Sequence, residues 1–437
     1  MEKEKYKWLP YKLIKIYIIV TMLLAILGPI KYEFEIFYTF FMIIYVLIFL
    51  FITRYSMQTT SNYKTDNYTT QINDRKIMII LKMSITISLI IKIMLVISSI
   101  KIYGVPKMSN FFATFADVYS NMHHGEFIEN IYRQIDTFCT FIFYFSMFVG
   151  IFWFKRIKIG YKLMLILSII LDLMYQIFYI GTQRSIITIV IVMIVIFTKS
   201  AIKKDYKIDK KKIIKLGCFL FIILIIILNV LSARKELWDE NYYKTSNQFD
   251  LNHPTLVLFK SKKVRYDICN LISYFTQGWY GFTLALKTPF EWTYFLGGFR
   301  GINSVVSQIF TKVPNLTDFT YPVRAGKLYN FDGLACWYTI FPWLASDFTF
   351  TGALVFMGIV AKIYMKSWIQ TIKYNNPIAF IITVLITIQY FFIVANNQIF
   401  IQRGESIAVV ILFIIYCVFG KKYNYNQIEN LKGDKFE

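Results

Sequence analysis

The chain is poor in the residues and motifs that many enzymes use for catalysis. Among its 437 residues are three histidines, five cysteines and 26 acidic residues. The cysteines show no CxxC or Cys/His spacing, which argues against metal and redox roles, although Cys269 and Cys336 share one predicted loop and could pair. The sequence has no DxD pair, HExxH, GxSxG or glycine loop followed by lysine, so metal-dependent and nucleotide-driven chemistries lose support. We therefore expect no metal and no cofactor.

Apolar and basic residues are what the chain has in abundance. Hydrophobic residues make up 57% and aromatics 19%, a composition outside the range of soluble domains. The formal net charge of +22 would favour nucleic-acid binding in a soluble protein. Here the lysines cluster in short segments between apolar runs, as in cytoplasmic loops facing anionic lipid. The composition predicts a polytopic membrane protein that binds membrane lipid and no nucleic acid.

The apolar runs predict about ten membrane spans, because a helix needs about 20 residues to cross the hydrocarbon layer. They lie near 13–30, 36–53, 77–100, 136–154, 163–180, 186–199, 214–232, 350–365, 377–395 and 405–420. The lysine-rich N-terminus, the 155–162 and 199–215 loops and the tail then share one face, which the charge rule assigns to the cytoplasm together with both termini. We predict an all-α polytopic membrane protein, with residues 1–437 forming a single integral membrane domain.

Two long segments fall on the opposite, outer face in this topology. They cover residues 101–135 and 233–349. A structureless loop of the second length is improbable, and the aromatic stretch 271–286 is typical of an interfacial or re-entrant helix. The larger segment is therefore expected to contain short helices of its own.

The fifth span carries a polar stripe. Asp172, Tyr175, Gln176, Tyr179 and Gln183 are three and four residues apart, which places them on one helical face. A carboxylate in mid-membrane is costly and needs a cavity or a partner. In the third span Lys92 is the obvious partner, so an Asp172–Lys92 tie between helices is the simplest interpretation.

Most arginines fall on the face that the lysines avoid. The seven are Arg133, Arg184, Arg234, Arg265, Arg300, Arg324 and Arg403. Four of them lie beside glycine, in GTQRS (Arg184), GGFRG (Arg300), VRAG (Arg324) and QRGES (Arg403), where a bulky anion can approach. Guanidinium groups bind phosphate oxygens in pairs. These four are the candidate pyrophosphate ligands, against the alternative of ordinary surface or lipid-headgroup arginines.

Candidate general bases lie in the same outer segments. Asp332 and Asp347 are the first choices, against helix-capping or turn roles. Of the histidines, His253 is a further candidate toward a sugar hydroxyl, with a solvated loop histidine as the alternative.

Three elements resemble the Wzy-type oligosaccharide repeat-unit polymerases of bacterial capsule and O-antigen assembly. They are GTQRSIIT at a span end, the outer GGFRG turn, and the YTIFPWLASDFTFTGALVFMGIVAKIY stretch. Arg184 matches the arginine of the family's glycine-and-arginine element. Asp347 and Gly352 match its Asp-aromatic-x-x-x-Gly pattern, from which residues 349–351 depart slightly.

The resemblance implies a GT-C-like helical fold in the bacterial cell membrane. It also implies an undecaprenyl-pyrophosphate-linked oligosaccharide as substrate, joined into longer chains outside the cell, with a flippase and a chain-length regulator as partners. In that mechanism Arg184 and Arg300, helped by Arg324 or Arg403, neutralise the departing pyrophosphate, and a carboxylate or histidine takes the proton of the attacking hydroxyl.

Three other functions remain open. A ligase that transfers a finished glycan from the same carrier would use the same arginines. A transporter or flippase for the lipid-linked glycan is disfavoured because the chain has no mirrored halves. An acyltransferase would normally have a histidine within or beside a span, and none is present.

Overall fold

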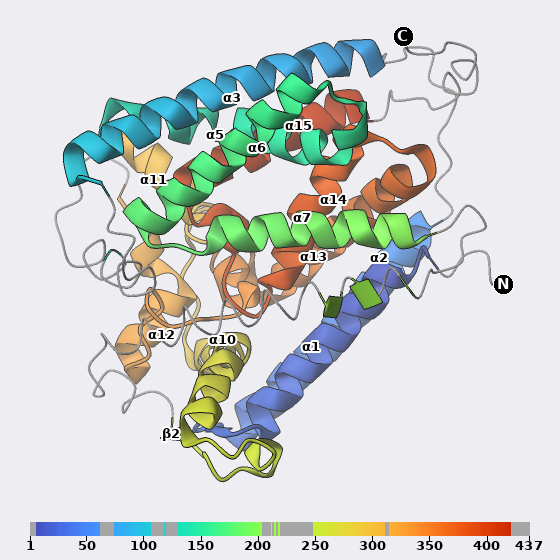
Figure 1. Ribbon diagram of the computed structural model, residues 1–437. Helices are drawn as coiled ribbons and strands as arrows, with labels where there is room; N and C mark the ends of the chain where they lie inside the picture. Colours follow the sequence, from blue (N-terminus) through green and yellow to red (C-terminus); the bar gives the residue numbers. More distant parts are fainter. Residues whose placement is uncertain are drawn as a thin grey trace.

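The computed structural model describes residues 6–61, 74–105, 130–202, 248–310 and 314–420, with a few isolated positions between 118 and 218. Most of the predicted span 214–232 and of the 101–135 loop lies outside the described residues. The same holds for His123, His124 and Arg234. Within the described part, helices dominate and pack around each other along most of the molecule (Figure 1).

Seven described helical segments are long and apolar enough to cross a membrane. They are α1 (Leu9–Leu27), α2 (Ile36–Thr60), α3 (Asp74–Tyr103), α5 (Ile131–Phe152), α6 with its π-helical extension η4 (Ile159–Ile180), α7 (Arg184–Ala201) and α13 (Ile340–Tyr374). Two shorter apolar helices follow, α14 (Pro377–Phe391) and α15 (Arg403–Phe419). Large apolar side chains stay exposed on the spans, among them Leu27, Phe51 and Ile159, as expected of helices that face lipid. The predicted all-α polytopic membrane fold is confirmed.

The helices give the bundle two chemically different ends. At the first, the lysine-rich end, Lys155, Lys158, Lys162, Lys199 and Lys373 lie at or near helix termini. Contacts here join distant parts of the chain: the Arg156 guanidinium pairs with Asp74 at 2.8 Å, Trp368 donates to the Tyr6 carbonyl, and Asn376 donates to the Gly420 carbonyl. The opposite end carries Arg184, Arg300 and Arg403 and is called the arginine-rich end.

Shorter elements follow the masked region and lie toward the arginine-rich end. These are α10 (Lys262–Lys287), α11 (Arg300–Ile309), α12 (Tyr321–Tyr329) and the 3-10 turns η5 (Pro254–Leu256) and η6 (Leu316–Phe319). A two-residue antiparallel ribbon joins β1 (Ile30–Lys31) to β2 (Gln248–Phe249). In Figure 1, α10 lies beside α1, with α12 nearby.

The helix predicted over 271–286 is present and longer than expected, and it is packed into the protein. Trp279 of α10 is fully buried and donates its indole N–H to the Thr21 hydroxyl of α1 at 3.3 Å. A side chain at Gly278 would collide with the Val394 carbonyl and the Thr339 amide. Glycine is therefore what lets α10 approach the segments around Thr339 and Val394.

The span predicted at 350–365 is part of a longer helix, α13, that breaks at Thr349. This residue has φ 63° and ψ 167°, a backbone conformation that is essentially reserved for glycine. Its hydroxyl accepts from the Gly352 amide at 3.3 Å and so caps the second half of the helix. The break separates buried residues 340–347 from a second half that carries exposed apolar side chains such as Val355 and Ile359.

The possible Cys269–Cys336 disulfide is not formed, and both cysteines are buried. Cys336 belongs to a small apolar cluster with Leu284 of α10. In the straight helix Leu284 lies about four turns, or roughly 22 Å, beyond Cys269. The two sulfurs therefore occupy separate parts of the core.

Candidate functional site

Among the described helices, three begin at an arginine, and all three meet at the arginine-rich end. They are α7 at Arg184, α11 at Arg300 and α15 at Arg403. The N-terminus of a helix is its positive end, so a cation there is unfavourable unless an anion compensates it. Helix N-termini and guanidinium groups are also the two protein features that bind phosphate best. Their convergence makes this the candidate anion site.

Arg184 is carried by a sharp corner between α6 and α7. The π-helical turn η4 (Gln176–Ile180) ends at Gly181, whose φ of 70° is left-handed and suits glycine. The guanidinium of Arg184 pairs with Glu405 of α15 and donates to the Gln398 carbonyl. Arg184 thus links α7 to the start of α15, with its side chain 12% exposed.

Arg300 follows a glycine turn that a buried carboxylate holds. Asp347 Oδ1 accepts from the Thr293 hydroxyl at 2.5 Å and the Gly297 amide at 3.1 Å, and Oδ2 accepts from the Gly298 amide at 2.9 Å. A side chain at Gly298 would meet the Trp343 carbonyl and Asp347 itself. Successive backbone N–H groups that enclose an anion form a nest, and here the enclosed anion is Asp347, 2% exposed.

The Arg300 side chain lies over an aromatic ring and feels the charge of a carboxylate. Its guanidinium lies 5.5 Å from the centre of the Trp343 ring, within the range of a cation–π contact. Burial lowers the pKa of Arg300, and the negative charge of nearby Asp332 opposes that shift. Asp332 itself is exposed and accepts from the Leu334 amide at 2.8 Å, which is a local turn contact.

Arg403 binds the same face of α11 that carries Arg300. Its Nε donates to the Ser304 hydroxyl at 2.8 Å, and Ser304 lies four residues after Arg300. A Cβ at Gly301 would overlap the Gln402 carbonyl and the Ser406 hydroxyl, so α11 and α15 touch at their first turns. Arg300 and Arg403 therefore flank one helix–helix contact.

The segment between α14 and α15 ties these parts together. Asn396, in a left-handed conformation with φ 83°, accepts from the Trp343 indole at 2.9 Å. Asn397 donates to the Gly298 carbonyl at 2.9 Å and accepts from Gln389 at 2.7 Å. The next carbonyl, that of Gln398, is the acceptor for Arg184. Three consecutive residues thus fix the ring beneath Arg300, the glycine turn and Arg184.

The remaining predicted residues lie outside this convergence. Arg324 pairs with Glu291 at 3.0 Å and donates to the Pro289 carbonyl at 3.0 Å. His253 caps η5, where its Nδ1 accepts from the Thr255 amide at 3.3 Å. The structure therefore brings Arg184, Arg300 and Arg403 to one end of the bundle, where Asp347 holds the turn before Arg300 and Asp332 acts on Arg300 electrostatically.

An apolar groove of about 590 Å³ opens beside the break in α13. Its polar lining residues are Asp347 and Thr349. The other lining residues are Phe290, Trp292, Phe295, Phe348, Gly352, Val355, Phe356 and Ile359. The groove reaches the exposed face of α13 at Val355 and Ile359, which are 59% and 53% exposed. At its inner end Phe348 and Phe356 pack on Phe299, the residue before Arg300.

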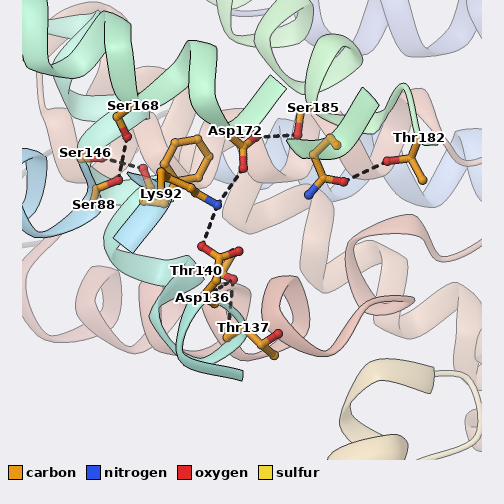
Figure 2. A network of polar contacts seen from close by, with 12 residues as sticks. Ser88, Lys92, Asp136, Thr137, Thr140, Ser146, Ser168, Asp172, Thr182 and Ser185 are labelled. Carbon is orange, nitrogen blue, oxygen red and sulfur yellow. Dashed lines mark hydrogen bonds and ion pairs between the residues drawn. The ribbon is translucent and has the colours of Figure 1, made fainter. Parts of the chain in front are cut away.

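A buried ionic network joins α3, α5 and α6, and Figure 2 shows its side chains. Lys92 of α3 pairs with Asp172 of α6 at 2.7 Å, so the predicted tie is confirmed. It also pairs with Asp136 of α5 at 2.7 Å, a second partner that was not among the sequence predictions. The second oxygen of Asp172 accepts from the Ser185 hydroxyl at 2.8 Å. The network therefore contacts the residue that follows Arg184.

The sequence left three further residues without a role. Glu405 lies two residues after Arg403 in the sequence, yet its partner is Arg184, which is 221 positions away in the chain. Trp343 gives no signal in an aromatic-rich sequence. The position of Asp136 at the start of an apolar run is a signal, because a carboxylate there needs a partner.

Comparison with known proteins found no matching family model, no similar curated protein and no similar solved structure. Function is therefore argued from the residues of the site.

Proposed function

We propose that the protein is a membrane glycosyltransferase that joins polyprenyl-pyrophosphate-linked oligosaccharide repeat units into a longer polysaccharide. The observation that carries this proposal is the convergence of three arginine-led helix N-termini, Arg184, Arg300 and Arg403. Such a site suits a compact, multiply charged anion such as pyrophosphate. The site lies at the end of the bundle opposite the lysine-rich end. Because the charge rule assigns the lysine-rich end to the cytoplasm, the site would face the outside of the bacterial cell membrane.

The apolar groove supports a lipid-linked substrate. It runs from the exposed face of α13 to Phe299, one residue from Arg300. A polyprenyl tail in this groove would remain in contact with the bilayer while its pyrophosphate reached the arginines. A soluble sugar phosphate would have no use for this groove.

In the proposed reaction a sugar hydroxyl of one repeat unit attacks the anomeric carbon of another. The new C–O bond forms as the bond to the pyrophosphate breaks, and the lipid pyrophosphate leaves with the electron pair. Arg300 and Arg403, with Arg184, offset the charge that develops on it. The hydroxyl proton goes to a base, for which exposed Asp332 beside Arg300 is the best placed carboxylate.

Asp347 is a poor base in this arrangement, because both of its oxygens already accept hydrogen bonds from the glycine turn. We assign it to holding the turn that presents Arg300. His253, which caps η5, has no contact with the arginines among the described interactions.

The proposal is tested with purified protein in liposomes, supplied with a native polyprenyl-pyrophosphate repeat unit and neither nucleotide nor metal. We expect a ladder of lengthened glycans that is lost in Arg300→Ala and reduced in Asp332→Asn. Arg156→Ala, which removes a guanidinium from the lysine-rich end, is the matched control and should keep the ladder. An unchanged ladder in Arg300→Ala would overturn the assignment.

A single transferred block in place of a ladder would identify the ligase alternative. Arg184→Lys separates charge from shape, because the guanidinium of Arg184 contacts both Glu405 and the Gln398 carbonyl. A lysine keeps the charge and loses the planar fork, so most activity should disappear.

A second candidate, transport of the lipid-linked glycan, draws on a different observation. The buried Lys92–Asp136–Asp172 group and the helix breaks at Gly181 and Thr349 are features that transporters share. Movement of a labelled lipid-linked glycan between liposome leaflets, without chain growth, would favour it.

A further inference from the structure

We propose that Lys92 is a positioning residue that holds the first turns of α7 and α15 in register through two separate carboxylates. The inference rests on the proposed function for its catalytic consequence, since these turns carry Arg184, Arg403 and Glu405. Its geometric part stands independently of that function.

One arm runs from Lys92 to α7. Lys92 Nζ lies 2.7 Å from Asp172 Oδ1, and Asp172 Oδ2 accepts from the Ser185 hydroxyl at 2.8 Å. Ser185 is the second residue of α7 and follows Arg184 directly. The same corner is fixed again where Thr182 donates to Gln176 at 2.9 Å. Figure 2 shows this arm on the side of Lys92 that faces Ser185.

The other arm runs from Lys92 to α15 by way of α5. Lys92 Nζ lies 2.7 Å from Asp136 Oδ1, and Asp136 lies within one turn of Thr137 and Thr140 (Figure 2). These threonines form the surface on which Gly404 rests. A Cβ at Gly404 would come within 2.5 Å of the Thr140 hydroxyl and 2.9 Å of the Thr137 carbonyl. Gly404 stands between Arg403 and Glu405, so α5 sets the position of both.

The two arms meet again at the site. Glu405, just after Gly404, pairs with Arg184, just before Ser185. The ring of contacts therefore runs from Lys92 through α6 to Arg184, across to Glu405, and back through α5 to Lys92. A change in one arm should shift the partner of the Arg184–Glu405 pair that this arm positions.

Stability alone is a weak explanation for this group. Burying ions costs several kcal/mol each, and replacing a buried ion group by apolar residues is often neutral or stabilising. Lys92 faces two carboxylates, with Arg133 close enough to Asp136 to interact with it electrostatically. The Phe143 ring lies 4.5 Å from Lys92 Nζ and packs the ammonium from a third side. A lysine that pairs with both α5 and α6 fixes the relative position of these two helices more than it stabilises the fold.

The test uses two amides that report on the two first turns. The Ile187 amide donates to the Gln183 carbonyl at the start of α7, and the Ser406 amide donates to the Gln402 carbonyl at the start of α15. Hydrogen–deuterium exchange of the peptides containing them is measured on the full-length protein in lipid nanodiscs. Asp172→Asn should speed exchange at Ile187 at least tenfold and leave Ser406 within twofold. Asp136→Asn should do the reverse.

Two further variants separate positioning from simple loss of fold. The triple variant K92M/D136N/D172N removes all three charges of the group together and should fold, with faster exchange at both amides. Asp74→Asn, on the same helix α3 but paired with Arg156 at the lysine-rich end, should change neither. Equal exchange at both amides in the triple and native proteins would overturn the proposal, as would identical effects of the two single variants.

Activity then tests the catalytic consequence. In the triple variant kcat for chain growth should fall at least tenfold while KM for the lipid-linked unit stays within twofold. If the native protein makes no ladder, the proposed function fails while the exchange results still decide the positioning role. A fully active triple variant would show that the register of α7 and α15 has no effect on the reaction.

Discussion

Replacing Asp347 with asparagine distinguishes a catalytic base from a residue that builds the site. The carboxylate accepts three hydrogen bonds in a buried position, two at Oδ1 and one at Oδ2. Asparagine keeps a carbonyl oxygen, which can still serve the Thr293 hydroxyl and the Gly297 amide. Its NH₂ group would then face the Gly298 amide, donor against donor.

The size of the effect follows from these contacts. A hydrogen bond to a charged group contributes about 1.5–3 kcal/mol, and a buried N–H without an acceptor costs about 1–3 kcal/mol. The two free-energy figures partly describe the same lost interaction and so do not add in full. We expect Asp347→Asn to lower the free energy of unfolding by about 2–4 kcal/mol. The glycine turn should loosen, and with it Arg300.

The assay is unfolding of the purified protein by titration with SDS, followed by tryptophan fluorescence. Asp332→Asn is the matched control. Its exposed carboxylate accepts one side-chain hydrogen bond, from the Leu334 amide, which the asparagine carbonyl can still accept, so the change should cost less than about 1 kcal/mol. If Asp347→Asn abolished chain growth with an unfolding free energy within about 0.5 kcal/mol of native, the structural role would be wrong. Asp347 would then be the better candidate for the base.

Three other changes test separate features. Thr349→Gly should raise the free energy of unfolding by about 1 kcal/mol, because glycine adopts the positive φ of this residue without strain. Thr349→Ala keeps a Cβ and should not be stabilising. A stabilising alanine in the same SDS titration would refute the backbone strain. Gly301→Ala should cost at least about 2 kcal/mol in that titration, because its Cβ would overlap the Gln402 carbonyl. Gly160→Ala, whose Cβ would meet nothing within 4 Å, should be neutral or stabilising. Equal effects of the two changes would argue against close α11–α15 packing. Burial raises the pKa of the Cys336 thiol to about 12. In a variant whose other four cysteines are replaced, maleimide should therefore label Cys336 only after denaturation. Rapid labelling of the folded protein at pH 7.5 would contradict the burial.

Much of the membrane architecture could be predicted because it depends on local pattern. Apolar length predicted the membrane-spanning helices of the described part, and the cost of an ion in hydrocarbon led from Asp172 to Lys92, whose pairing the structure confirms. Helix ends were less accurate: the 350–365 span proved to be the middle of α13, since the buried aromatic residues before the break at Thr349 read as a loop. The side of the membrane stays a prediction.

The contacts within the candidate site needed the structure, since they join residues far apart in the chain. The glycines beside Arg184, Arg300 and Arg403 predict places where a bulky anion can approach the arginines. In the structure they are also places of tight packing or sharp turning. Nothing in the sequence says that Gly297 and Gly298 direct their amides at Asp347, a carboxylate that the sequence offers as a candidate base. Such convergence depends on the fold and leaves no local pattern.

The segment Asn396–Gln398 also limits how this protein can change in length. Its three residues contact three different partners in sequence: the Trp343 indole, the Gly298 carbonyl and the Arg184 guanidinium. One inserted residue would advance every side chain by a position, so that none would face its own partner. Most connections between helices accept insertions readily; this one has no room for any, and homologous chains of different length should differ elsewhere.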